Sequence, residues 1–122
     1  SYESLPFRRV KTVAELDEIV RQSNNQYLMV KFYADWCVSC KEMERFTLSD
    51  AQVQARLEDV MLLTIDVTEG NADDMALLKR FNLFGPPGIL FIDRQGNDIP
   101  DVRVIGFLNK NDFLAVLNAI LI

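Results

Sequence analysis

The sequence predicts an α/β fold in which helices flank a mixed central sheet of four to five strands. Runs rich in β-branched and aromatic residues alternate with segments of helical periodicity, and the last two of these runs are separated only by a turn. The chain has 122 residues, of which 49% are hydrophobic and 25% are charged, and this suits one compact domain with its own core. We therefore expect a single domain over residues 1–122.

The expected order of elements is β-α-β-α-β-α-β-β-α. The strands are expected over residues 7–10, 27–33, 60–67, 88–93 and 102–107. The helices are expected over residues 12–23, 37–46, 71–81 and 109–120, with a short helical segment after Asp50. Strands that are separated by helices favour parallel pairing, and the final hairpin adds antiparallel strands.

Local signals justify these elements in turn. Thr12 and Glu15 have the form of a capping box, which begins the first helix. The runs at 27–33 and 60–67 are almost continuously apolar, as is typical of buried central strands. Residues 94–97, Arg-Gln-Gly-Asn, form the turn of the hairpin. The third and fourth helices have apolar side chains at helical spacing, namely Met75, Leu78, Phe81, Phe113, Val116, Leu117 and Ile120.

Composition and charge exclude several classes of protein. The net charge is −5 and no basic patch is visible, so we expect no nucleic-acid partner. No apolar run approaches the ~20 residues of a membrane span, so this domain is not expected to cross a membrane itself. Two Cys and no His cannot supply a four-ligand zinc site, and we predict no metal site. The first residues, Ser1-Tyr2-Glu3-Ser4, include no initiator Met, so we expect a fragment of a longer protein, from which a membrane anchor could have been cut away.

The only two cysteines, Cys37 and Cys40, lie where a strand is expected to run into a helix. Closing so short a loop adds only about 2 kcal/mol by loop entropy, which favours reversible redox chemistry over a structural role. Cys37, at the helix N-terminus, is expected to be the exposed nucleophile, because unpaired N–H groups stabilise its thiolate. Cys40, one turn further on, is expected to be the buried resolving thiol. No cofactor beyond this redox-active disulfide is predicted.

The residues around the cysteines resemble a known family. The run from Tyr33 to Glu44 reads Tyr-Ala-Asp-Trp-Cys-Val-Ser-Cys-Lys-Glu-Met-Glu, with Pro87 before the fourth strand and Gly106 before the last helix. This layout resembles the thioredoxin fold over nearly the whole chain. The longer run to Val53 is similar to the C-terminal periplasmic domain of the DsbD family of bacterial transmembrane thiol-disulfide interchange proteins.

This resemblance implies a function. The domain would be a protein-disulfide reductase of the periplasm, within a bacterial inner-membrane protein. It would take electrons from the membrane-embedded domain and pass them to the N-terminal domain of the same protein, from which they reach disulfide isomerases and cytochrome c maturation proteins. Pro87 would be cis, would lie beside the disulfide and would take part in catalysis. The residues expected to bind partners come from loops at one end of the sheet: Trp36, Phe84, Pro86, Gly106 and Phe107.

Two positions depart from the pattern of related proteins. Lys31 stands where thioredoxin-like proteins commonly have a buried Asp, six residues before the first cysteine. Glu44 resembles the second acidic residue of the DsbD domain and is the candidate catalytic proton acceptor, with which Lys31 could pair. Gly88 follows Pro87 where a Thr is usual, and Pro86 removes a backbone N–H that a bound peptide could use.

Several alternatives stay open from the sequence alone. The chain could be a non-catalytic thioredoxin-fold binding module, a copper(I) chaperone with two thiolate ligands, or a general soluble thioredoxin. Trp36 could be a core aromatic, and Phe84 and Phe107 could be core or rim residues. Glu44 could be an ordinary carboxylate of the helix surface, and Asp35 a solvated residue.

Overall fold

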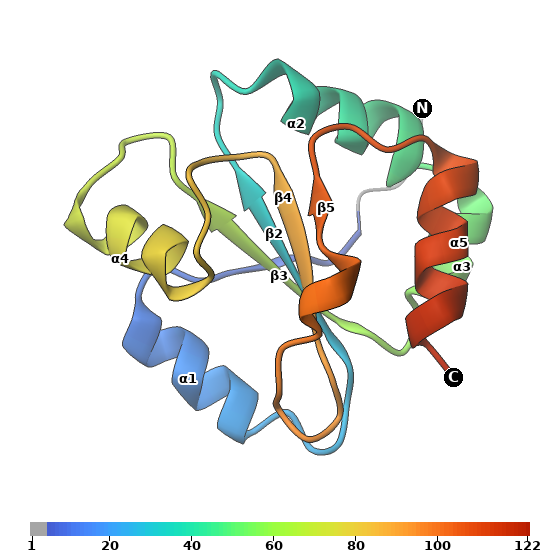
Figure 1. Ribbon diagram of the computed structural model, residues 1–122, viewed down its shortest axis with the longest axis horizontal. Helices are drawn as coiled ribbons and strands as arrows, with labels where there is room; N and C mark the ends of the chain where they lie inside the picture. Colours follow the sequence, from blue (N-terminus) through green and yellow to red (C-terminus); the bar gives the residue numbers. More distant parts are fainter. Residues whose placement is uncertain (1–4) are drawn as a thin grey trace.

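A five-stranded mixed sheet forms the centre of the computed structural model, which describes residues 5–122 (Figure 1). The strands are β1 (Arg8–Arg9), β2 (Leu28–Tyr33), β3 (Met61–Asp66), β4 (Gly88–Ile92) and β5 (Val104–Ile105), in the spatial order β1-β3-β2-β4-β5. β1, β3 and β2 pair in parallel, whereas β4 is antiparallel to both β2 and β5. The predicted α/β fold with a mixed sheet is confirmed. The expected domain begins at Ser1, but Ser1–Ser4 lie outside the described residues.

Helices cover both faces of this sheet. α1 (Val13–Arg21) and α4 (Ala72–Arg80) lie together on one face, and α3 (Ala51–Arg56) and α5 (Lys110–Ile120) lie together on the other (Figure 1). α2 (Val38–Glu42) follows β2 and continues directly into η1 (Met43–Thr47), a π-helical turn. A 3-10 turn, η2 (Pro100–Val102), precedes β5. The sheet is therefore the middle of three layers.

The direction of β4 differs from the expectation that strands separated by a helix pair in parallel. β4 follows α4, yet it runs antiparallel to β2, with Gly88 opposite Phe32. The chain turns at Asn82, which has a φ of 58° just beyond the end of α4. Residues 83–87 then bring it to the edge where β2 ends, so β4 starts beside the end of β2 rather than beside its beginning.

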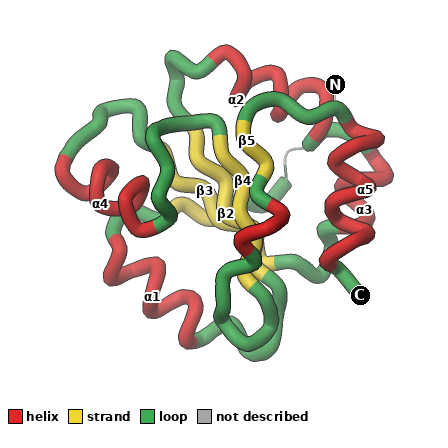
Figure 2. The backbone as a smooth tube through the Cα atoms, in the orientation of Figure 1, coloured by secondary structure: helices red, strands yellow, loops and turns green. Residues whose placement is uncertain are grey.

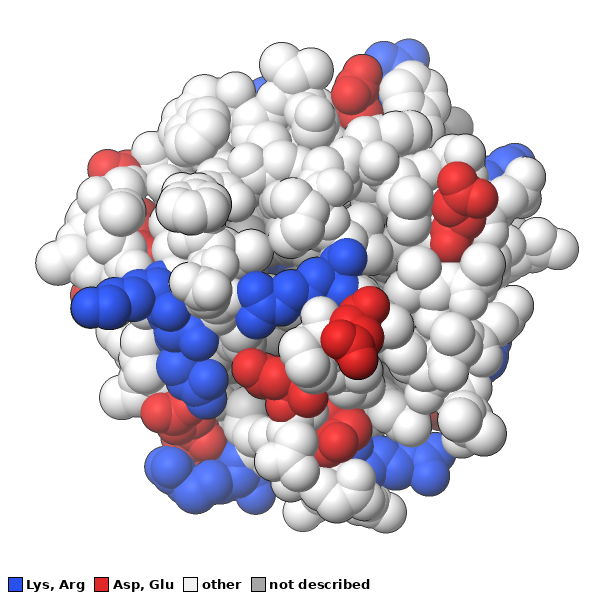
Figure 3. Space-filling model, in the orientation of Figure 1, with Lys and Arg blue, Asp and Glu red and all other residues white. Residues whose placement is uncertain are grey.

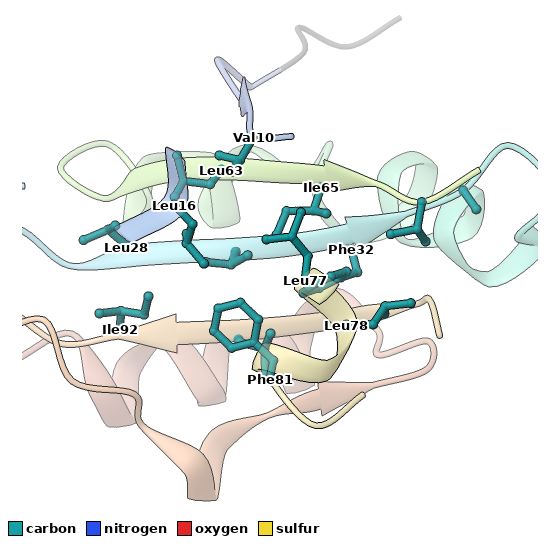
Figure 4. Close-up of a cluster of buried hydrophobic side chains, with 14 of the residues drawn as sticks. Val10, Leu16, Leu28, Phe32, Leu63, Ile65, Leu77, Leu78, Phe81 and Ile92 are labelled. Atoms are coloured by element: carbon teal, nitrogen blue, oxygen red, sulfur yellow. The ribbon is translucent and has the colours of Figure 1, made fainter. Parts of the chain in front are cut away.

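Side chains alternate between the two faces of the central strands and build two cores. On β2, Leu28 and Phe32 pack under α1 and α4, where the rings of Phe32 and Phe81 meet edge to face at 5.8 Å between centroids (Figure 4). Met29, on the same strand, faces the opposite core with Phe113 of α5. Burying one such side chain stabilises the folded state by about 1.5–3 kcal/mol. Both cores therefore stabilise the sheet that carries the site.

Two expected elements change character before their predicted ends. The strand expected over 102–107 is only Val104–Ile105, because Pro100 begins the 3-10 turn and Gly106 leaves the extended conformation with a φ of 87°. The helix expected over 37–46 becomes π-helical at Met43. In the first case, the backbone preferences of Pro and Gly override the β-type composition of the run.

Replacing Gly106 by Ala should destabilise the domain through backbone conformation alone. Apart from its two neighbours in the chain, no heavy atom of the described residues lies within 4 Å of a Cβ added at Gly106, but its φ of 87° disfavours any residue with a side chain. We expect the free energy of unfolding, measured in urea, to fall by roughly 1 kcal/mol. Gly85→Ala is the matched control, since Gly85 has equal space and no positive φ. A loss of the same size in that control would contradict the explanation.

Candidate functional site

Three loops meet at one edge of the sheet. Phe32 near the end of β2, Gly88 at the start of β4 and Ile105 at the end of β5 lie in one row of paired residues. The segments that adjoin this row are residues 34–37, 82–87 and 106–109, and Figure 2 shows them as loops in the upper part of the view. The strand pairing thus brings together the cysteines, the two prolines and the loop after β5.

A disulfide bond joins Cys37 and Cys40, whose Cα atoms are 5.3 Å apart. Cys37 is the N-cap of α2: its N–H donates to the carbonyl of Ala34 at 3.0 Å, and its Sγ accepts the N–H of Cys40 at 3.2 Å. In the reduced protein the same N–H would be available to a Cys37 thiolate, which favours the charged form of this sulfur. The geometry therefore supports Cys37 as the nucleophile.

The expected contrast in exposure between the two cysteines is wrong for this disulfide-bonded state. Cys37 is 6% exposed and Cys40 is 4% exposed, and both belong to the buried cluster that contains Phe32 and Ala34. The bond between the sulfurs holds Cys37 against the same core as Cys40, whose Sγ lies 3.8 Å from the carbonyl oxygen of Phe32. A partner must therefore reach Cys37 through the surface that the neighbouring loops form.

The peptide bond between Pro86 and Pro87 is cis, as the family resemblance implies. Both prolines are half-buried, and Pro87 directly precedes the residue that pairs with Phe32. The unusual Gly88 has a structural reason. A Cβ added there would lie 3.1 Å from Cδ1 of Leu83, so Leu83 fills the space that a Thr side chain would need. The catalytic role of Pro87 stays a prediction.

Trp36 is exposed but held in place. It is 62% exposed, while its indole Nε1 donates to the carbonyl of Thr68 at 3.1 Å. The hydroxyl of Thr68 accepts the N–H of Asp35 at 2.9 Å and donates to Oδ1 of Asp66. Arg9 pairs with the other carboxylate oxygen of Asp66 at 3.2 Å. A chain of polar contacts from β1 and β3 thus fixes the residues just before Cys37.

Sequence reasoning does not single out Thr68, although a signal for it exists. β3 and β2 are parallel neighbours, and Asp66 pairs with Tyr33. A residue two positions beyond this pair lies at the carboxyl edge of the sheet, where ligands and functional loops of α/β proteins gather. The missing information is the strand order, which the sequence leaves open.

Apolar side chains are exposed on the loops around the disulfide. Phe84 is fully exposed and Phe107 is 44% exposed, so a place in the core is wrong for both of them and for Trp36. Val38 and Ile105 are exposed as well. Figure 3 shows few charged side chains over the start of α2 and the loop before β4. An exposed apolar surface of this kind is typical of a protein-binding site.

Lys31 and Glu44 form an ion pair, a question that the sequence left open. The Nζ of Lys31 lies 2.5 Å from Oε2 of Glu44, and the two side chains are 10% and 34% exposed. Lys31 also lies over the ring of Phe7, 4.1 Å from its centroid. Glu44 is the second residue of the π-helical turn η1, directly after the helix that carries Cys40.

Tyr33 connects this ion pair electrostatically with the contacts around Thr68. Burial raises the pKa of the Tyr33 phenol, and the carboxylates of Asp35, Glu44 and Asp66 raise it further. The Nζ of Lys31 lies 5.9 Å from the centroid of the Tyr33 ring. Tyr33 is therefore a neutral phenol at neutral pH, among three carboxylates from different segments.

The fold and the disulfide define a class of protein. Residues 14–121 match the family model of the thioredoxin-like domain. A thioredoxin from Thermus thermophilus shares the fold, with a TM-score of 0.73 at 22% identity over 97% of this chain and 89% of that one. The chain is a thioredoxin-like domain.

More similar relatives define the branch. The C-terminal domain of DsbD from Neisseria meningitidis, in its oxidised form, matches with a TM-score of 0.73 at 32% identity, over 88% of this chain and 90% of that one. Proteins named thiol:disulfide interchange protein DsbD are 59% identical in Ralstonia nicotianae over 91% of this chain, and 47% identical in Escherichia coli over 93%. The chain belongs to the DsbD family and corresponds to its C-terminal domain.

The match covers only a part of these curated relatives. The chain spans 18% of the length of the Ralstonia protein and 20% of the Escherichia coli protein. Within residues 5–122, no helix combines the length and the apolar character that a membrane crossing requires. The comparison therefore concerns one domain of those proteins.

Thr68→Val should loosen Trp36, because the isosteric side chain can neither accept the N–H of Asp35 nor donate to Asp66. Trp36 is the only tryptophan, so fluorescence anisotropy reports on this residue alone, and we expect it to fall. Thr64→Val is the matched control, since Thr64 is a half-buried residue of β3 whose side chain has no hydrogen bond to the described residues. Unchanged anisotropy in Thr68→Val would mean that the indole contact alone fixes the ring.

Proposed function

We propose that this domain is a thiol-disulfide oxidoreductase that acts as a protein-disulfide reductase. The observation that carries the proposal is the disulfide between Cys37 and Cys40 at the start of α2, in a chain of the DsbD family. Support comes from the contacts of Thr68 before Cys37 and from the N–H of Cys40 on the Cys37 sulfur. The site offers a nucleophile, a second thiol within bonding distance and an apolar surface for a partner.

The proposed reaction consists of two exchanges in sequence. The Cys37 thiolate of the reduced domain attacks one sulfur of a partner disulfide, which forms a mixed disulfide and releases one partner thiolate. Cys40 loses its proton and attacks the Cys37 sulfur, which releases the second partner thiolate and forms the Cys37–Cys40 bond present in the structure. Two electrons pass to the partner, and an external dithiol must restore the reduced state.

The proposal assigns this domain to an electron relay. The dithiol donor is the membrane-embedded domain of the same protein, and the acceptor is its N-terminal domain, from which electrons reach disulfide isomerases and cytochrome c maturation proteins. The domain then works in the periplasm, as one thioredoxin-like unit over residues 1–122 of an inner-membrane protein. Membership of the DsbD family supports these assignments.

Partner binding is assigned to a docking surface made of Trp36, Phe84, Pro86, Gly106 and Phe107. Its three aromatic side chains are exposed, and its loops adjoin the row of paired residues next to the disulfide. Thr68 already holds the indole of Trp36, so binding a partner costs little conformational freedom there. Exposed, fixed aromatic rings are frequent hot spots of protein interfaces.

The alternatives are less well supported. Relatives named thiol:disulfide interchange proteins favour redox chemistry at the two sulfurs over copper(I) binding. Identities of 29–59% to DsbD proteins, against 22% to the Thermus thioredoxin, favour the DsbD branch over a general thioredoxin. A non-catalytic binding module has no use for a Cys37 sulfur that is preorganised by the N–H of Cys40.

The wild-type domain should reduce insulin with dithiothreitol as electron source, and Cys40→Ala should trap a mixed disulfide. In Cys40→Ala the Cys37 thiolate can still attack, but nothing resolves the product, so a disulfide-linked complex with insulin should persist on a non-reducing gel. Cys37→Ala is the matched control and should give no such complex. Trapping by Cys37→Ala instead would reverse the assigned roles. Failure of the wild-type chain to reduce insulin would contradict the proposed function.

We assign Glu44 the proton of the resolving thiol, and its pair with Lys31 predicts opposite effects of two substitutions. Glu44→Gln leaves the Lys31 ammonium uncompensated, so thiolate formation should shift to lower pH, while the resolving step slows. Lys31→Met leaves the carboxylate uncompensated, so thiolate formation should shift to higher pH. The double variant should lie near the wild type, because the intact pair has no net charge.

Thiolate absorbance titrations of these four proteins give the measurement. Unchanged midpoints in both single variants would make Glu44 an ordinary surface carboxylate. The proton of Cys40 would then have to pass to another group or to water.

A further inference from the structure

The loop that carries Phe107 is held by two side chains of the π-helical turn η1. The N–H of Leu108 donates to Sδ of Met43 at 3.2 Å, and the hydroxyl of Thr47 donates to the carbonyl of Leu108 at 2.6 Å. Both backbone polar groups of one residue are thus bound by side chains of one helical turn. We call this pair of contacts the Leu108 clip.

Both side chains of the Leu108 clip are deeply buried. Met43 is 2% exposed and Thr47 is 0% exposed. A buried hydroxyl is costly unless it forms a hydrogen bond, and a Val would fill the same space without that requirement. Packing alone therefore does not explain a hydroxyl at position 47, whereas the bond to Leu108 does.

The π-helical turn connects the Leu108 clip with the helix that carries the disulfide. Cys40 of α2 belongs to the core on the α1–α4 side, whereas Met43 belongs to the core on the α3–α5 side. The wider turn between these two cores is closed by the N–H of Leu48 on the carbonyl of Met43 at 2.8 Å. Single π-helical turns are frequent at functional sites. Here the turn joins the helix of the two cysteines to the loop after β5.

The Leu108 clip and the sheet fix this loop from both ends. Ile105 pairs with Gly88, and Leu108 is held by η1, so only Gly106 and Phe107 lie between two anchored residues. Gly106 has open space around it among the described residues, and Phe107 is exposed. The loop therefore presents accessible backbone and an apolar ring in a fixed arrangement, next to the segment that carries the cis proline.

We infer that Met43 and Thr47 are positioning residues for partner recognition. Through Leu108 they fix the conformation of Gly106 and Phe107. This conformation is the one that binds the polypeptide segment around the disulfide of a protein substrate. This inference rests on the proposed function and adds a specificity device to it. Because the polar atoms of both side chains are used by Leu108, the Leu108 clip governs recognition of a protein substrate and leaves the exchange chemistry at the sulfurs unchanged.

The first test compares a protein disulfide with a small one. Thr47→Val should raise the KM for insulin about fivefold, with kcat little changed, which corresponds to one lost hydrogen bond of about 1 kcal/mol. Reduction of dithionitrobenzoate, a small aromatic disulfide, should stay within about twofold of the wild type. Thr47→Ser keeps the hydroxyl and should restore the KM for insulin. Ser49→Ala is the matched control, since it removes a hydroxyl bonded to the carbonyl of Arg45 rather than to Leu108.

The second test follows the Leu108 amide by hydrogen exchange. Met43→Leu removes the sulfur acceptor at nearly constant volume, so exchange at Leu108 should become faster by about tenfold or more while the amides of β3 stay protected. The KM for insulin should rise in this variant too.

The outcomes separate the inference from the proposed function. The inference would be overturned if Thr47→Val reduced kcat/KM equally for insulin and for dithionitrobenzoate. It would also be overturned if the KM for insulin stayed unchanged in variants whose Leu108 amide exchanges faster. A wild-type chain that reduces neither disulfide would overturn the proposed function and, with it, the recognition role of the Leu108 clip.

Discussion

The antiparallel pairing of β4 with β2 is the constraint on which the site depends. A parallel β4 would start at the opposite edge of the sheet and would carry Pro87 away from the disulfide. Instead Gly88 lies opposite Phe32, and β5, antiparallel to β4, ends at Ile105 opposite Gly88. The direction of β4 therefore places both the cis proline and the Gly106 loop next to the start of α2.

At this edge, hydrogen bonds fix what the apolar cores leave undetermined. Hydrophobic burial is non-directional, so it stabilises the sheet without setting the conformation of the loops. Direction comes from three separate sets of polar contacts: those of Thr68 before Cys37, that of the Cys40 N–H on the Cys37 sulfur, and those of η1 on Leu108. Among the described residues, no buried side-chain nitrogen or oxygen lacks a hydrogen-bond partner. The site is thus preorganised by groups that are satisfied before any partner arrives.

The sequence predicts the local elements and the reactive groups better than the supports of the site. Apolar runs and the N-cap signal at Thr12 act within a few residues, so β2, β3 and α1 lie close to their predicted positions; the Glu15 carboxylate accepts the N–H of Lys11 rather than that of Thr12, as a full capping box would require. The direction of β4 depends on the path of residues 83–87. Hydrophobic periodicity predicts the type of an element but not the path of a loop. The Cys-x-x-Cys spacing predicts the disulfide directly. The supporting roles of Thr68 and Thr47 can be recognised only once the strand order and the π-helical turn are known.

The contact between Leu83 and Gly88 has a consequence for evolution within the family. A Cβ at position 88 would lie 3.1 Å from Cδ1 of Leu83, so the two positions share one volume. A side chain at position 88 would require the end of the Leu83 side chain to shift by a few tenths of an ångström. Relatives with Thr at position 88 should carry a smaller or differently shaped residue at position 83, and the two positions should covary. Such covariation would make the glycine after the cis proline one half of a compensated exchange rather than the simple loss of a hydroxyl group.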